Sequence, residues 1–146
     1  MSNLFSPHGA FQFHVSNTIL IARLTGSWNV ECADSFSEQF KHYVKPLTGK
    51  PWGHLVILDE WHLGVPQIST VIYELVTWCM NNGLEKSAQV YSDSMIKQYH
   101  LDKMIIDRKG NFERQIFRDT EGALQWLNQY GFTIENNKET HLFITM

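Results

Sequence analysis

The feature that most constrains the fold is an unbroken apolar run, residues 55–58 (LVIL), in the middle of the chain. Gly53 precedes the run, and two chain-breaking residues, Gly64 and Pro66, follow it at a short distance. Such a run is typical of a strand covered on both faces, as in the parallel sheets of α/β proteins. Ligands of open parallel sheets bind beyond the carboxyl ends of the strands. We therefore expect functional residues in the segment 59–65.

The residues before this run predict a hairpin and a helix. Alternating apolar residues in 11–15 predict a half-buried strand, and after a short turn the apolar residues 19–22 predict a second strand further inside the sheet. Asn29 is a suitable N-cap for a helix that Pro46 ends, with apolar residues at helical spacing between them.

The residues after the run predict a long helix, a short strand and a weaker helix. The long helix begins after Pro66, carries an apolar stripe on one face and ends near Gly83, a suitable left-handed cap. Residues 88–91 predict the strand, and Asp93 is the expected N-cap of the weaker helix, which runs through Met104.

The last third of the chain predicts a loop, a strand, a helix and a tail. Residues 107–113 are polar and contain a glycine, so we expect a mobile loop. Residues 114–118 form the last strand, and Asp119 caps the final helix, which Gly131 closes. The tail, 132–146, ends on apolar residues, and two outcomes stay open for it: pairing with an exposed sheet edge, in this chain or in a second copy, or fraying.

The elements follow the order ββαβαβαβα, which predicts an α/β fold with a mixed, mostly parallel sheet and helices packed against it. We expect a single domain over 1–146, with its core at about 9–131 and the tail outside it. The composition, 43% hydrophobic and 18% charged, is that of a globular protein, and 146 residues can bury a sizeable core.

Charge and cysteine content limit the partners and the compartment. The net charge is -3, and Lys and Arg are scattered, so we expect no nucleic-acid partner. Cys32 and Cys79 stand alone, and the chain shows neither an export signal nor an apolar run long enough to span a bilayer. These features predict a cytoplasmic protein with reduced thiols.

The residue pattern gives little support to catalysis or metal binding. Glu60 and His62 alternate in an extended segment and point the same way, but no nucleophile, orienting group or oxyanion glycine motif accompanies them. The seven histidines show no metal-ligand spacing. Residues 48–50 (TGK) precede a strand, whereas a phosphate-binding loop follows one. We therefore predict no enzyme activity, no metal and no cofactor.

Four segments carry these apolar and turn patterns in a familiar combination: LTGSWNVECADSF, PLTGKPWGHLVILDEWHLGVP, MNNGLEKSAQVYS and IFRDTEGALQWLNQYG. Together they resemble the SpoIIAA-like branch of the STAS superfamily, over about Gly9 to Gly131. The resemblance implies the STAS fold. In members that are anti-sigma factor antagonists, partner switching depends on a phosphorylatable Ser just after the central strand. The corresponding place in this chain has Asp59 and Glu60, two carboxylates that can mimic a constitutively negative site.

The resemblance also implies an apolar ligand, because the architecture is similar to that of lipid-carrying CRAL-TRIO domains. An apolar wall with few polar anchors at the carboxyl ends of the strands suits such a ligand. Our first hypothesis is therefore a non-enzymatic binding module for an apolar small molecule or lipid, exchanged at a membrane surface. Its expected ligand-binding residues are Trp28, Trp52, Asp59, Trp61, His62, Leu63 and Val65.

The alternative hypothesis is a regulatory protein-interaction domain of the partner-switch type that lacks the phosphorylatable Ser. The segment 59–65 and the exposed face of the following helix, with Tyr73, Thr77 and Met80, would then contact another protein. Self-association into a homodimer, through the aromatic surfaces or the tail, is a related expectation. The start of that helix lacks a good side-chain N-cap, so the segment can move to admit a ligand or partner.

Overall fold

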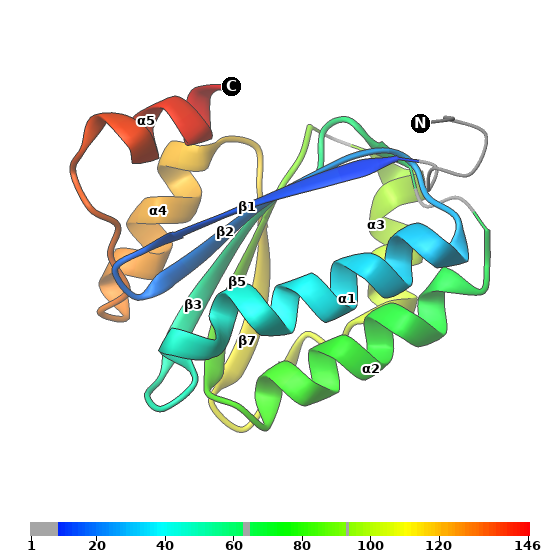
Figure 1. The fold of residues 1–146 in the computed structure, drawn as a ribbon, viewed down its shortest axis with the longest axis horizontal. Coiled ribbons are helices and arrows are strands. Elements are labelled where there is room, and N and C mark those ends of the chain that lie inside the picture. Colours follow the sequence, from blue (N-terminus) through cyan, green and yellow to red (C-terminus); the bar gives the residue numbers. More distant parts are fainter. Residues whose placement is uncertain (1–8, 63–64, 93) are drawn as a thin grey trace.

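The structure of the protein is a computed structural model that describes residues 9–62, 65–92 and 94–146 (Figure 1). Within these ranges the strands are β1 (Ala10–Ser16), β2 (Ile19–Ser27), β3 (Trp52–Ile57), β4 (Trp61–His62), β5 (Leu84–Val90), β6 (Arg108–Lys109) and β7 (Phe112–Phe117). The helices are α1 (Val30–Val44), the 3-10 turn η2 (Lys45–Leu47), α2 (Ile68–Met80), α3 (Met95–Met104), α4 (Thr120–Gln129) and α5 (Lys138–Thr145).

In the described part of the chain, seven strands form a mixed sheet with the order β1-β2-β3-β5-β7-β6, and β4 pairs with β2 beside this path. The inner strands β2, β3, β5 and β7 are parallel to one another. β1 is antiparallel to β2 at one edge, and β6 is antiparallel to β7 at the other. The predicted α/β fold and the mostly parallel sheet are confirmed, and the predicted elements occur in the expected order, with β4, β6 and α5 in addition.

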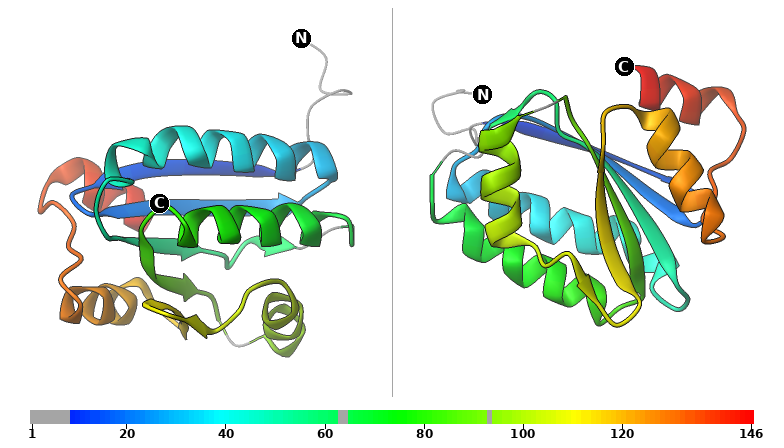
Figure 2. Two further views of the ribbon diagram at one scale, coloured as in Figure 1. Left: turned by 90° about the horizontal axis from the view of Figure 1, so that it is seen from below. Right: turned by 180° about the vertical axis from the view of Figure 1, so that it is seen from behind.

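Helices cover both faces of this sheet (Figure 2): α1, α2 and α3 lie on one face, and α4 and α5 on the other. The side chains of β2 divide accordingly, because Leu20 and Leu24 belong to the core under α1 and α2, whereas Ile19 and Ile21 belong to the core under α4. Every residue of β3 is buried. The apolar run therefore forms a central strand, as its composition predicts.

Several helix ends follow the predicted local chemistry. The side chain of Asn29 accepts a hydrogen bond from the Cys32 amide at 2.9 Å at the start of α1. Asp119 accepts one from the Gly122 amide at 2.7 Å at the start of α4. α2 begins at Ile68 without a side-chain cap, also as expected.

Two predictions between Asp93 and β7 were wrong. The N-cap of α3 is Ser94, whose hydroxyl accepts from the Lys97 amide at 3.1 Å; the predicted cap, Asp93, lies outside the described residues. The expected mobile loop, 107–113, instead contains a hairpin in which Arg108 pairs with Glu113. Their side chains form an ion pair at 2.9 Å, which adds to the backbone pairing in holding the segment against β7.

The tail neither pairs as a strand nor frays, so both expected outcomes were wrong. It forms α5, capped by Asn137, whose side chain accepts from the Thr140 amide at 2.8 Å. Arg23 of β2 donates from Nη2 to the carbonyl oxygens of Phe143 and Ile144, at 2.7 and 3.1 Å. A cation at the last carbonyl groups of a helix is a favourable cap, and it fastens the tail to the sheet.

Candidate ligand cavity

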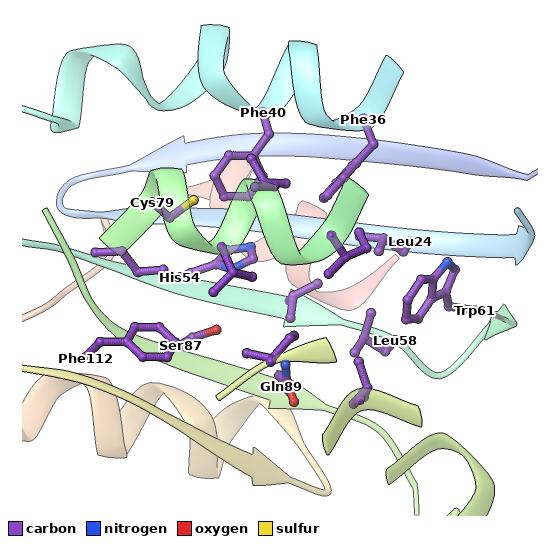
Figure 3. A pocket seen from close by; sticks show the side chains of 17 residues that line it. Leu24, Phe36, Phe40, His54, Leu58, Trp61, Cys79, Ser87, Gln89 and Phe112 are labelled. Carbon is purple, nitrogen blue, oxygen red and sulfur yellow. The ribbon is translucent and has the colours of Figure 1, made fainter. Parts of the chain in front are cut away.

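A small cavity lies between the sheet and the helices α1, α2 and α3 (Figure 3). It offers about 60 Å³ to the centre of a water-sized sphere, which is room for roughly four water molecules. Its lining is apolar on the helix side, where the stripe of α2 faces Phe36 and Phe40 of α1. The polar lining groups come from the sheet: His54 of β3, and Ser87 and Gln89 of β5.

The alternation of side chains along β3 and β5 brings these polar groups together. His54 pairs in register with Ser87, and Val56 pairs with Gln89, so all four side chains leave the sheet on the same face. Leu55 faces the opposite core, under α4. The polar wall is therefore built by two neighbouring parallel strands.

His54 is the most unusual residue of the cavity. Its exposed fraction is 8%, its Nε2 has no hydrogen-bond partner among the described residues, and its ring meets Phe40 edge-on at 5.1 Å between centroids. Burial lowers the pKa of this imidazole from 6.5 to about 3, so the ring is neutral at neutral pH. Figure 3 shows it pointing from β3 toward α2.

Gln89 connects the cavity to a charged cluster outside it. Its Oε1 accepts from Nη1 of Arg114 at 2.9 Å. The same guanidinium, on β7, pairs through Nη2 with the carboxylates of Asp102 and Asp107. The positive charge is thus paired with carboxylates that do not line the cavity, and Arg114 holds the side chain of Gln89 in place.

Trp61 closes the end of the cavity nearest the carboxyl ends of the strands. It is 1% exposed because β4 folds back beside β2, where Trp61 pairs with Gly26. Trp28, also buried, meets it edge-on at 5.5 Å. The indole nitrogen Nε1 of Trp61 has no hydrogen-bond partner among the described residues. The tip of the central strand therefore contributes an indole to the core rather than to the surface.

The remaining residues of the predicted ligand wall lie elsewhere. Trp52 is at the amino end of β3, where its Nε1 donates to the carbonyl of Asn82 at 2.8 Å, so its expected place at the carboxyl ends was wrong. His62 and Val65 are exposed to solvent. Leu63 lies outside the described residues.

Asp59 fixes the carboxyl end of β3 and does not line the cavity. Its Oδ1 accepts from the amide and the hydroxyl of Ser92, at 2.7 and 3.1 Å. Lys97 of α3 donates from Nζ to the carbonyl oxygen of Leu58 at 2.7 Å. These bonds tie the end of β3 to the end of β5 and to α3.

The predicted interaction residues share one face of α2, away from the cavity. Tyr73 is 62% exposed, the hydroxyl of Thr77 donates to the Tyr73 carbonyl at 3.0 Å, and Met80 is half-buried. Their spacing of four and three residues places them along one side of the helix.

Other site chemistry finds little support in the described part of the chain, where no three His, Cys, Asp or Glu side chains gather as metal ligands. Cys32 and Cys79 are free and buried, and burial raises the pKa of both thiols, so neither is poised as a nucleophile. The described helices are all too short or too polar to span a bilayer.

Sequence reasoning missed most of the cavity residues. Trp61 was expected there, whereas His54, Ser87, Gln89 and Phe40 were not. A usable signal existed at His54, because it is a polar residue at a core-facing position of an otherwise apolar strand.

Comparisons with known proteins bear on the fold. No protein-family profile matches the chain, and no curated protein matches it. Among solved structures, it is similar to an uncharacterized protein of the DUF3478 family with a SpoIIAA-like fold, from Shewanella loihica PV-4. The identity is 14%, the alignment covers 87% of this chain and 98% of that one, and the TM-score is 0.60. This likeness confirms the resemblance found in the sequence: the chain has a SpoIIAA-like α/β fold.

Proposed function

We propose that the protein is a non-enzymatic binding module that takes up a small apolar molecule in the cavity between the sheet and α1, α2 and α3. The observation that carries the proposal is the cavity itself, about 60 Å³ with apolar walls on the helix side. Protein interiors contain few voids larger than a water molecule. An empty apolar void of this size costs on the order of 1 to 2 kcal/mol, and a ligand that fills it recovers that free energy.

The size of the cavity favours a small molecule over a lipid chain. An engineered apolar cavity of about 150 Å³ holds benzene, and this space is less than half as large. A longer ligand requires α2 to move outward, because α2 contributes Ile72, Leu75, Val76 and Cys79 to the wall. The uncapped first turn of α2 lowers the cost of such a movement.

Titration of the methyl-labelled protein with 1-chloropropane, followed by NMR, tests cavity binding. We expect saturable shifts of methyl groups that line the cavity, such as those of Val56 and Leu75. Cys79→Met places extra atoms in the cavity and should abolish them, whereas Cys32→Met adds the same atoms to a buried site outside the cavity and should not.

The proposal fails if the wild-type protein gives no saturable shifts, or if Cys79→Met binds the probe as well as the wild type does. If the wild-type protein binds the probe, mass spectrometry of small molecules that copurify with the native protein identifies a natural ligand of the size that the cavity admits.

The SpoIIAA-like fold is typically non-catalytic. The neutral His54 and the buried thiols fit a non-enzymatic binding role.

A second candidate function is contact with a protein partner through the outer face of α2. It is favoured by Tyr73, the most exposed of the large apolar side chains in the described part of the chain, at 62%. Tyr73→Ala should abolish capture of a partner in a pull-down, whereas Tyr99→Ala, at a tyrosine that is 57% exposed on α3, should not. Equal capture by both variants contradicts this candidate.

A further inference from the structure

The polar groups of the cavity are uncharged, and this limits what the cavity can hold. None of the described side chains that line it belongs to Lys, Arg, Asp or Glu. The guanidinium of Arg114, which contacts the lining residue Gln89, also pairs with two carboxylates that do not line the cavity. A carboxylate or ammonium group placed inside would lose its hydration without meeting an opposite charge. A charged ligand is therefore disfavoured.

Two buried nitrogens on described cavity-lining side chains have no hydrogen-bond partner: Nε2 of His54 and Nε1 of Trp61. The indole N–H can only donate, whereas Nε2 of a neutral imidazole donates or accepts. Nε2 has no partner, although the ring is almost completely buried. A neutral imidazole carries one N–H donor and one acceptor nitrogen, and the tautomer decides which of them is Nε2. A hydroxyl group both donates and accepts, so it can pair with Nε2 in either tautomer.

We propose that the cavity selects small uncharged molecules that carry a hydroxyl group, with His54 Nε2 as the hydrogen-bond partner of that hydroxyl and the apolar helix wall as the site of the alkyl part. This inference rests on the proposed function and specifies its ligand class. Water can satisfy Nε2 in the same way, but an alcohol that displaces the water also buries its alkyl group against α1 and α2.

Three probes of similar size separate the hydroxyl contribution from size and charge: 1-propanol, 1-chloropropane and propanoate. In the wild-type protein, we expect 1-propanol to bind at least about tenfold more tightly than propanoate, because the cavity offers the anion no cation. His54→Phe keeps a ring of similar shape and removes both nitrogens. It should weaken 1-propanol binding by about 3- to 10-fold, the factor of one hydrogen bond, and change 1-chloropropane binding by less than about twofold.

The outcomes distinguish failure of the proposed function from failure of the proposed preference for a hydroxyl group. If neither 1-propanol nor 1-chloropropane binds the wild-type protein, the proposed function fails. If 1-chloropropane binds but His54→Phe weakens both probes equally, or propanoate binds as tightly as 1-propanol, the cavity binds apolar molecules and the hydroxyl assignment is overturned.

A second measurement keeps the test independent of the variant. The ring ¹⁵N resonances of His54 in the wild-type protein report directly on hydrogen bonding at Nε2. We expect 1-propanol to shift the Nε2 resonance saturably and 1-chloropropane to shift it much less. Equal shifts with both probes overturn the assignment even if His54→Phe does not fold.

Discussion

Mild acid should destabilise the folded protein through His54, and His54→Phe should remove that part of the sensitivity. The imidazole is buried and lacks a partner at Nε2, and its pKa falls from 6.5 to about 3. Because the folded state does not accept a proton on His54 until the pH approaches 3, acidification favours the unfolded chain, in which the imidazole is free to protonate.

The sign and the size follow from these two pKa values. The unfolded state binds more protons than the folded state between pH 6.5 and 3, so the contribution of His54 to stability is fully present above about pH 6.5 and is lost as the pH falls toward 3. One pH unit within this window corresponds to about 1.4 kcal/mol. At pH 5, about 1.5 units below the unfolded pKa, the wild-type protein should have lost about 2 kcal/mol through this residue.

Urea unfolding followed by tryptophan fluorescence, at pH 8 and at pH 5, measures this loss. His54→Phe should unfold with nearly wild-type stability at pH 8, because an apolar ring replaces a buried group that lacks a partner. At pH 5 it should be more stable than the wild type by about 2 kcal/mol. His100→Phe, at an exposed histidine, controls for the loss of a titratable ring. If wild type and His54→Phe lose equal free energy between the two pH values, the reasoning is refuted.

Three further substitutions test contacts that hold the fold together. Asp102→Ala removes one of two carboxylates from the buried Arg114 and should lower the free energy of unfolding by about 2 kcal/mol in urea titrations. Asn137→Ala removes the N-cap of α5, so amide exchange in 138–145 should quicken by the equivalent of about 1 kcal/mol, and unchanged exchange would contradict the cap. Gly83→Ala places a Cβ 2.7 Å from the carbonyl oxygen of Lys50 and should lower the melting temperature more than Gly131→Ala, whose Cβ meets nothing within 4 Å at a similar positive φ.

The elements that the sequence predicted well have strong local determinants. Residues 55–58 are apolar on both sides of the strand, and Asn29 and Asp119 bond to amides only three residues away. Such signals depend on neighbouring residues, so the fold class and the order of elements could be derived without knowledge of the tertiary structure.

The structures that the sequence failed to predict depend on tertiary contacts. α5 depends on Arg23, more than 100 residues away, which caps its last carbonyl groups. The hairpin at β6 depends on pairing with β7 and on the ion pair between Arg108 and Glu113. Its polar composition alone is equally compatible with a loop, so the sequence pattern could not distinguish the two.

The candidate site was hard to predict because its described residues come from eight separate helices and strands and carry no motif. Trp61 was identified from its place after the central strand, but its burial results from the pairing of β4 with β2. His54 stands between glycine and leucine, where its polarity is visible in the sequence. The lack of a partner at Nε2 is not visible there, since it depends on which side chains surround the ring.

The structure changes the role of the segment that follows β3. Asp59 and Lys97 anchor its backbone to the end of β5 and to α3, and the exposed Asp59 and Glu60 are not part of the cavity wall. Among the described residues of this segment, Leu58 and Trp61 line the cavity. α2, by contrast, contributes four wall residues and begins without a side-chain cap. A ligand larger than the present cavity would therefore be admitted by displacement of α2, with the anchored end of β3 and the polar wall of β3 and β5 remaining in place to hold it.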